Sequence, residues 1–236
     1  MPISIALFGA AGRMGRVILC EAQEVDDIKV AHAYEKTGHP LIGQRIEGLR
    51  IEATPKEIGK DTQVIVDFST AEAALRHVQM AADARVPCVA GVTGISEQGH
   101  SELKRHAKII PILWAPNMSP GMTMLFKLAP LLAKSLPDYD RHIIETHHTQ
   151  KKDAPSGSAL MLQSALSETG ETPITSLRLG DIAGEHRLIL AGPGERIELI
   201  HHAQSRRAFA LGTLRAVRWI VSKEAGLYSM DDVLAP

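Results

Sequence analysis

Two histidines and two lysines stand close together in the stretch ETHHTQKKDAPSGSAL, residues 145–160. Histidine, with an ordinary pKa of about 6.5, can give or take a proton near neutral pH, and lysine can supply a proton where negative charge develops. His147 lies four residues before Lys151, so both side chains can converge on one point. Because side chains alternate along a strand, His147 and His148 face opposite ways unless the strand has already ended. His147 and Lys151 are therefore candidate catalytic residues.

The residues that follow predict an anion site at the start of a helix. Ser156 is a helix cap after Pro155, and Gly157 and Ser158 lead into the helical run SALMLQSALSE. Backbone N–H groups at a helix N-terminus, together with hydroxyl groups, suit a carboxylate. A cation, an acid–base group and a carboxylate site thus fall within residues 147–158.

Two other interpretations of the histidines stay open. An arbitrary histidine pair is more often structural or solvated than catalytic. A metal site is a further alternative, because a second pair occurs at His201 and His202. The sequence has neither an H-E-x-x-H motif nor a cysteine pair at ligand spacing, so we assign no metal ligand.

A glycine-rich turn near the N-terminus predicts a dinucleotide site. The motif FGAAGRMG follows a β-rich run and opens a helical one, with Gly9, Gly12 and Gly15 at regular spacing. Such a turn lets N–H groups at a helix N-terminus approach a pyrophosphate. The next β-rich run ends at Glu35, which suits free ribose hydroxyls, while Lys36 could meet a 2′-phosphate. The candidate cofactors are NADH, NADPH or both; the alternative is a turn that binds nothing.

Two later loops are candidates for the same site. AGVTG, residues 90–94, and APNMS, residues 115–119, each follow a predicted strand. Ligands of open α/β sheets bind beyond the carboxyl ends of the strands, so both loops could line the nicotinamide. As ordinary strand–helix turns they would have no such role.

These candidates need a scaffold, and the pattern of the chain predicts one in the α/β class. β-rich and helical runs alternate up to about residue 115, which predicts βαβ units and a parallel sheet. A helix capped by Ser119 and kinked at Pro130 comes next, and then strands of a mostly antiparallel or mixed α+β domain. A last helix, residues 207–226, should end at Gly226 and cover the first sheet. The first-sheet strands are expected at 3–9, 28–35, 62–69, 86–92 and 108–115, with helices at 13–24, 71–84 and 97–107.

Composition excludes several classes of function. The balance of 26 basic against 27 acidic residues gives no field that would recruit nucleic acid or an anionic membrane. No apolar run has the length of a membrane span and the first residues lack a charged leader, so a cytoplasmic protein with a small-molecule partner is expected. Cys20 and Cys88 lie in apolar runs and are expected to be buried, reduced thiols.

Taken together, six motifs resemble the 4-hydroxy-tetrahydrodipicolinate reductase family, also called dihydrodipicolinate reductases. They are GAAGRMG, AGVTG, APNMS, ETHHTQKKDAPSGSA, GDIAGEH and SRRAFALGTLRAVRW. The resemblance implies NAD(P)H-dependent reduction of a cyclic dicarboxylate, with loss of water, to tetrahydrodipicolinate in the diaminopimelate route of lysine biosynthesis. It also implies a Rossmann-like dinucleotide-binding domain at 1–119 with 207–236, and a substrate-binding and oligomerisation domain at 120–206 whose sheet makes a homotetramer in many members.

The resemblance also implies roles for single residues. His147 is similar to the family's acid–base group and Lys151 to its proton donor. The substrate contacts that it implies are His148, Ser156, Gly157, Ser158 and Arg206. The cofactor positions that it implies are Gly9, Ala10, Ala11, Gly12, Arg13, Met14, Glu35, Lys36, Gly91, Val92, Thr93, Ala115, Pro116, Asn117 and Met118.

The chain departs from the family pattern at two places. The segment before Gly180 is shorter than in many members, which bears on the oligomeric state, and NMSPGMT carries Pro120 and Thr123 where a branched apolar residue and Asn are usual.

Two competing functions also remain. A nucleotide-sensing module would have no reason to carry His147 and Lys151, and a different dehydrogenase would keep the cofactor loops but change the second domain.

Overall fold

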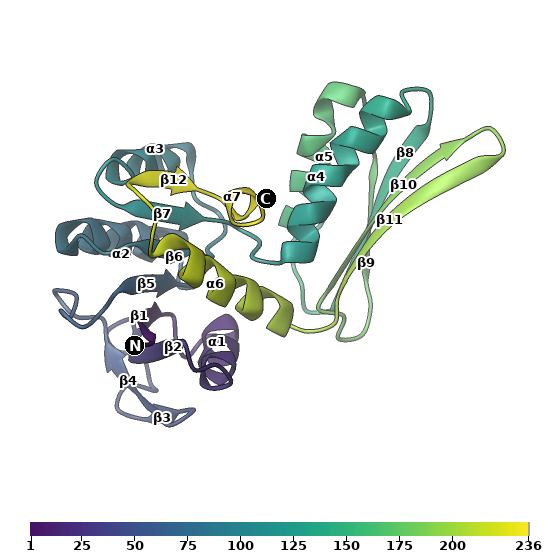
Figure 1. Cartoon of the computed structure of the whole chain (residues 1–236). Helices are drawn as coiled ribbons and strands as arrows, with labels where there is room; N and C mark the ends of the chain where they lie inside the picture. Colours follow the sequence, from purple (N-terminus) through teal and green to yellow (C-terminus); the bar gives the residue numbers. More distant parts are fainter. Residues whose placement is uncertain (236) are drawn as a thin grey trace. The chain divides into compact units, whose positions relative to one another are not determined.

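The chain folds into two compact units, and the computed structural model describes residues 1–235 (Figure 1). The first unit comprises Met1–Met118 and the segment from Phe209 onward, whereas the second comprises Ser119–Ala208. Each unit has a buried apolar core of its own. No helix within the described residues is long and apolar enough to cross a membrane.

A largely parallel sheet forms the first unit. Its strands are β1 (Ile3–Phe8), β2 (Ile28–Glu35), β3 (Arg45–Ile46), β4 (Leu49–Ala53), β5 (Val64–Asp67), β6 (Cys88–Ala90), β7 (Pro111–Trp114) and β12 (Gly226–Tyr228). Across the described chain their order is β12-β7-β6-β5-β1-β2-β4-β3, and neighbours are parallel except for β3 and β4. The strand order extends to both sides of β1, as in Rossmann-type folds, so the predicted α/β class is confirmed.

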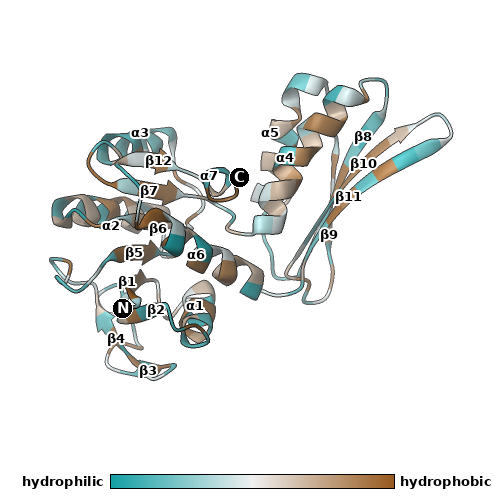
Figure 2. Ribbon diagram, viewed as in Figure 1, coloured by the Kyte–Doolittle hydropathy of each residue, from teal (hydrophilic) through white to brown (hydrophobic). Residues whose placement is uncertain are grey.

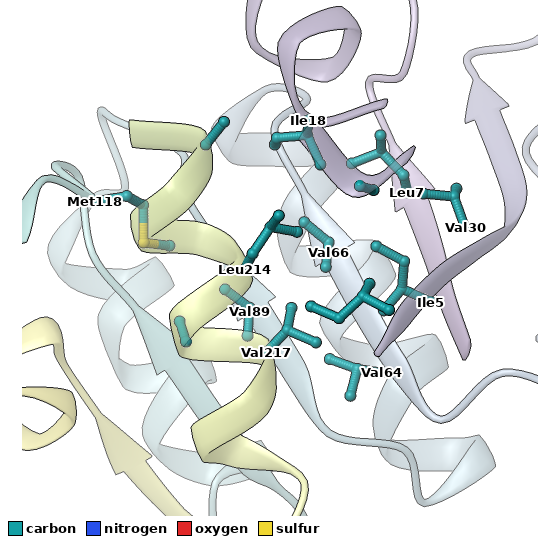
Figure 3. Packing of buried hydrophobic residues seen from close by; sticks show 14 of the residues in the cluster. Ile5, Leu7, Ile18, Val30, Val64, Val66, Val89, Met118, Leu214 and Val217 are labelled. Carbon is teal, nitrogen blue, oxygen red and sulfur yellow. The ribbon is translucent and has the colours of Figure 1, made fainter. Parts of the chain in front are cut away.

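Helices cover both faces of this sheet. They are α1 (Arg13–Gln23), α2 (Ala71–Ala84), α3 (Glu97–His106), α6 (Arg207–Ile220) and the short α7 (Met230–Val233). Ile5 and Leu7 of β1 belong to one core with α1 and α6, whereas Ala6 and Phe8 belong to the other core with α2 and α3. Strands buried on both faces are continuously apolar, as the colouring of β5, β6 and β7 in Figure 2 shows. Figure 3 shows Leu214 of α6 near Val66 of β5 and Val89 of β6, so the predicted return of the last helix to the first sheet is confirmed.

Two expectations about this unit are wrong. The last helix ends at Ile220 and not at Gly226, because the Lys223 N–H donates to the Ile220 carbonyl in a turn and Gly226 opens β12. Cys88 is buried as expected, but Cys20 is exposed because it lies off the buried face of α1. The sequence patterns also did not predict the short elements β3, β4, β12 and α7.

A four-stranded mixed sheet with helices on one face forms the second unit. Its elements are α4 (Pro120–Ser135), β8 (Asp140–His147), α5 (Gly157–Ala165), the short 3-10 helix η1 (Ser167–Thr169), β9 (Ile174–Arg178), β10 (Gly184–Gly192) and β11 (Glu195–Ala203). Within the described residues the order is β11-β10-β8-β9, with β8 and β9 parallel and the other pairs antiparallel. Leu125 of α4 and Leu162 of α5 pack against Ile143 and Leu188 of the sheet.

The start of α4 accounts for Pro120 and Thr123, the second departure from the family pattern. The Ser119 hydroxyl accepts a hydrogen bond from the Met122 N–H at 3.2 Å, and Pro120 occupies the first turn, where no intrahelical donor is needed. The Thr123 hydroxyl donates to the Ser119 carbonyl at 3.0 Å. Pro120 and Thr123 therefore belong to a well-formed helix start, and the helix continues through Pro130.

Candidate active site

The glycine turn of the first unit has the geometry of a phosphate-binding loop. Gly9 has a φ of 75°, and a side chain there would place its Cβ 2.7 Å from the Phe68 carbonyl oxygen, so only glycine fits. Gly12 is the N-cap of α1 and makes no side-chain cap hydrogen bond. The first-turn N–H groups of α1 therefore have no capping side chain, which suits an anionic pyrophosphate.

Glu35 contacts this turn directly. Its Oε1 accepts a hydrogen bond from the Ala11 N–H at 2.9 Å, and the Gly9 N–H donates to the Tyr34 carbonyl at 3.0 Å. The end of β2 is thus joined to the glycine turn, as a ribose-binding carboxylate requires. Lys36 is exposed beside it.

The loops after β5, β6 and β7 are joined to one another at the same edge of the sheet. The Gly91 N–H donates to the Asp67 carbonyl at 2.9 Å, and the Trp114 indole N–H donates to the Val92 carbonyl at 3.0 Å. A Cβ at Gly91 would lie 2.2 Å from the Phe68 ring. Sequence reasoning missed the segment Phe68–Thr70, although it follows a predicted strand at the edge where ligands bind.

Some of the predicted cofactor residues can act only through their backbone. The side chains of Ala10, Val92, Ala115 and Met118 are buried, and Met118 belongs to the core with Leu214 (Figure 3). Arg13 and Thr93 are exposed, whereas Met14, Pro116 and Asn117 are half-buried. The cofactor roles of all these residues remain predictions.

In the second unit, His147 is the last residue of β8 and is bound to a buried carboxylate. Its Nδ1 donates to Glu145 Oε2 at 2.5 Å. Arg178, which lies beside His147 in the parallel register of β8 and β9, donates to both oxygens of Glu145, at 3.1 and 2.9 Å. His148 lies just after the strand has ended, so strand alternation does not govern its direction.

Burial and charge set the protonation of this cluster. Burial alone would raise the pKa of Glu145, but hydrogen bonds from Arg178, Ser176 and His147 lower it to about 2. Burial lowers the pKa of His147; the hydrogen bond and charge of Glu145 oppose this, and the charges of Lys151 and Arg178 reinforce it. The net shift is downward, so His147 is neutral at pH 7 and its Nε2 is available as an acceptor.

The loop with Lys151 is fixed to the same cluster. The Lys151 ammonium pairs with the Asp153 carboxylate at 2.9 Å, and Arg178 Nη2 donates to the Asp153 carbonyl at 2.5 Å. The Leu179 N–H donates to the His147 carbonyl at 2.8 Å. Lys151 therefore lies within electrostatic reach of His147, as the sequence spacing predicts.

The helix start at Ser156 completes the cluster. The Ser156 N–H donates to Glu145 Oε1 at 3.2 Å, and its hydroxyl accepts from the Ala159 N–H and hydrogen-bonds His186 Nε2, both at 3.2 Å. Gly157 is exposed, with no atom within 4 Å of where a Cβ would lie. That open first turn can accept a carboxylate.

Hydrogen bonds and an ion pair join three of the predicted residues of the second unit. His147, Lys151 and Ser156 are connected through Glu145 and Arg178, two residues that sequence reasoning missed. Arg206 lies between β11 and α6, and its substrate role stays a prediction, as do those of His148 and Ser158. Among residues 1–235, no three His, Cys, Asp or Glu side chains form a group that could hold a metal ion.

Two family models match the chain over nearly its whole length. The model for dihydrodipicolinate reductase, N-terminus, matches residues 3–118, and the model for dihydrodipicolinate reductase, C-terminus, matches residues 121–234. The chain belongs to the dihydrodipicolinate reductase family. The resemblance inferred from the motifs is therefore confirmed.

Relatives named 4-hydroxy-tetrahydrodipicolinate reductase support this membership. The protein from Syntrophus aciditrophicus is 38% identical over 96% of both chains, and the one from Aquifex aeolicus is 38% identical over 99% of both. Their alignments span 257 and 263 residues, more than the 236 of this chain, so these relatives carry residues that have no counterpart here.

Two solved structures share the fold. Dipicolinate-bound dihydrodipicolinate reductase from Paenisporosarcina sp. TG-14 matches with a TM-score of 0.78 at 20% identity, over 99% of this chain and 100% of that one. Aspartate semialdehyde dehydrogenase II from Vibrio cholerae matches with a TM-score of 0.61 at 12% identity, over 94% and 98% of the two chains. At these identities the likeness concerns the fold alone.

Proposed function

We propose that this family member reduces 4-hydroxy-tetrahydrodipicolinate with NADH or NADPH, consuming one proton and releasing tetrahydrodipicolinate, the oxidised cofactor and water. The observation that carries the proposal is the full-length match to relatives named for this reaction. The glycine turn with Glu35, and the cluster around His147, give the chemistry its residues. The reaction belongs to the diaminopimelate route of lysine biosynthesis.

The first unit would hold the dinucleotide and the second the substrate, with the division at residues 1–119 and 207–236 against 120–206. A bound nicotinamide supplies the hydride. The first turn of α1 is suited to the pyrophosphate, and Glu35 to the adenosine ribose. Backbone groups of the loops at residues 91–93 and 115–118 would position the nicotinamide.

Residues of the second unit would bind the substrate and move protons. N–H groups at Gly157 and Ser158 and the hydroxyl of Ser158 can bind one carboxylate, and Arg206 the other. Replacing a hydroxyl by hydride requires a proton for the departing water, and the Lys151 ammonium carries one. Neutral His147 can accept or return a proton at Nε2, because Nδ1 already donates to Glu145.

The proposal can be tested by following the loss of absorbance at the band of the reduced nicotinamide, which disappears when the cofactor is oxidised. Purified protein mixed with enzymatically generated substrate should oxidise NADH, NADPH or both, and dipicolinate should inhibit competitively with the substrate. Absence of oxidation with both cofactors would refute the proposed function.

We further propose that the site accepts both cofactors, because Glu35 and Lys36 adjoin the same turn. Lys36 is exposed and can reach a 2′-phosphate without displacing the Glu35 carboxylate from the Ala11 N–H. The change Lys36→Met should lower kcat/KM for NADPH by about tenfold, the value of one charge-assisted hydrogen bond, and leave that for NADH unchanged. Equal effects on both cofactors would contradict this assignment.

We also propose that the enzyme is a cytoplasmic homotetramer built on the sheet of the second unit. Helices α4 and α5 cover one face of this sheet, and the other face exposes Leu177 and Ile200. Light scattering after size exclusion should give a mass four times that of the chain, and Ile200→Glu should reduce it. A monomeric wild-type protein would contradict the proposal. The cytoplasm is proposed because reduced nicotinamide cofactors are available there.

A further inference from the structure

The carboxylate of Glu145 is the common hydrogen-bond acceptor for three groups of the second unit. Its side chain is fully buried, and it accepts hydrogen bonds from His147, Arg178 and the Ser156 N–H. A buried charge is costly unless it is paired and hydrogen-bonded, so a carboxylate in this place needs all of these donors. One side chain thus connects β8, β9 and the start of α5.

Arg178 extends this connection to the loop that carries Lys151. Its guanidinium donates to both oxygens of Glu145 and to the Asp153 carbonyl, and the Asp153 carboxylate holds the Lys151 ammonium. Loss of the Glu145 charge would therefore loosen Arg178, and with it the loop that holds the Lys151 ammonium in place. Planar guanidinium–carboxylate pairs fix direction as well as distance, which a lysine at position 178 could not reproduce.

The hydrogen bond to Glu145 also determines which nitrogen of His147 carries the proton. A carboxylate can only accept, so Nδ1 of His147 must donate, and the neutral ring keeps its lone pair on Nε2. That nitrogen lies on the side of Gly184, where a Cβ would come within 3.1 Å of it. The ring therefore has one tautomer and little freedom to turn.

We propose that Glu145 is the positioning residue of the substrate site: it sets the tautomer of His147 and, through Arg178 and the Ser156 N–H, the places of the Lys151 loop and of the anion-binding helix start. The proposal rests on the proposed function, because it concerns the same site. It assigns Glu145 no contact with substrate or cofactor.

The variant Glu145→Gln keeps the size of the side chain but removes its charge and replaces one acceptor oxygen by a donor. Arg178 donates to both oxygens, but Oε1 also accepts from the Ser156 N–H, which can only donate, whereas Oε2 faces His147 Nδ1, which can become an acceptor. The amide oxygen of glutamine should therefore take the place of Oε1. The amide nitrogen then lies opposite His147 and donates to Nδ1, so the ring carries its proton on Nε2, and the hydrogen bond from Arg178 Nη1 is lost. The His147 ring would keep its position, but its Nε2 would carry a proton and could no longer accept one.

Steady-state kinetics and histidine NMR test the proposal together. We expect kcat of Glu145→Gln to fall about 10²- to 10⁴-fold, the usual contribution of an acid–base group, with KM for the cofactor unchanged. Long-range ¹H–¹⁵N spectra, with His147 assigned through His147→Asn, should show the Nδ1–H form in the wild type and the Nε2–H form in the variant. Glu145→Asp keeps the acceptor and should recover part of kcat.

A matched control makes the same chemical change elsewhere in the unit. Glu168 is exposed in η1, and Glu168→Gln should leave kcat and the histidine spectra as in the wild type. If the wild type is active, either of two results would overturn the positioning role while leaving the proposed function intact. One is an unaltered kcat in Glu145→Gln, and the other is the Nε2–H form of His147 in the wild type. An inactive wild type would instead refute the proposed function, and the tautomer measurement would still decide the positioning role.

Should Glu145→Gln fail to fold, Arg178→Lys tests the link from Glu145 to Lys151, and the tautomer of His147 in the wild type tests the link from Glu145 to His147. It keeps the positive charge near Glu145 but loses the two-point contact and the bond to Asp153. Positioning predicts a lower kcat with unchanged cofactor binding, because the Lys151 loop is no longer held. Wild-type kcat in Arg178→Lys would overturn the link from Glu145 to Lys151.

Discussion

At the scale of single residues, the candidate proton groups differ in how they are prepared. His147 is buried and held neutral, whereas Lys151 is half-buried and keeps a charge partner in Asp153. A neutral imidazole can accept a proton while a nearby ammonium gives one. In these roles both side chains exchange protons with the substrate, and neither contributes to binding of the cofactor.

Replacing either group should therefore affect turnover alone. We expect His147→Asn and Lys151→Met to lower kcat by about 10²- to 10⁴-fold, the usual range for an acid–base group. The dissociation constant for NADH, measured by fluorescence quenching, should stay unchanged. Lys152→Met makes the same change at the exposed neighbour and should be nearly as active as the wild type. A collapse of NADH binding in His147→Asn would show that the role assignment is wrong.

The pKa of His147 gives a second test at this scale. The charged or titratable groups around it are Glu145, Lys151, Arg178 and His186. Burial and then the cations lower its pKa below 6.5, while Glu145 acts in the opposite direction. An NMR titration should give a midpoint below 6.5 in the wild type, and Lys151→Met should raise it by removing one positive charge. An unchanged midpoint in that variant would place Lys151 farther from His147 than proposed.

The sequence could indicate Glu145 but not Arg178. Glu145 is two residues before His147, so strand alternation alone puts both on one face. Arg178 lies 33 residues from Glu145, and only the parallel pairing of β8 with β9 brings it next to His147. Strand partners and register arise from tertiary packing, which the local pattern around residue 178 does not contain.

At the scale of secondary-structure elements, a buried acid joins β5 to α2. Asp67 ends β5 with its side chain fully buried; Oδ2 pairs with His77 Nδ1 at 2.6 Å, and Oδ1 accepts from the N–H and hydroxyl of Ser69. The His77 ring also lies 4.0 Å from that of Phe8, centroid to centroid. The pair holds the loop that contains Phe68, whose carbonyl oxygen leaves no room for a side chain at Gly9 of the glycine turn.

Removing one partner of this pair should destabilise the first unit. His77→Leu removes one hydrogen-bond partner of the buried Asp67 side chain, which keeps its two donors from Ser69, and the expected loss is about 1.5–3 kcal/mol. Both tryptophans, Trp114 and Trp219, belong to the first unit, so their fluorescence during urea denaturation reports on it. The double change Asp67→Leu with His77→Leu should be less costly than His77→Leu alone. A loss below 1 kcal/mol would show that the pair contributes little.

Long periodic elements could be predicted from sequence, and short or edge elements could not. β1 and β5 are apolar runs because helices cover both faces of the sheet, so their patterns are strong. β12 has three residues at the edge of the sheet, too few to show a period. The run 207–226 stays helix-like in composition beyond Ile220, and the turn at Lys223 that ends α6 has no glycine or proline to indicate it.

At the scale of the whole molecule, acid sensitivity should concentrate in the second unit. His147, His186 and His201 lie together there, with ring centroids of neighbours 5.3 and 6.4 Å apart. Burial lowers the pKa of all three. Each is neutral when folded and takes up a proton more readily when unfolded, so a fall in pH favours unfolding.

His186 should give the largest part of this effect. Burial and then the nearby His147 and His201 lower its pKa to about 3, from 6.5 in the unfolded chain. Its contribution is fully present above pH 6.5 and is lost as the pH falls toward 3, which amounts to about 2 kcal/mol between pH 6.5 and 5. Hydrogen exchange of peptides from β8 and β10, corrected for the intrinsic rate, should show this loss in the wild type. His186→Phe fills the same space without a titrating group, so it should remove about 2 kcal/mol of the pH dependence; the same dependence in both proteins would exclude His186 as its source.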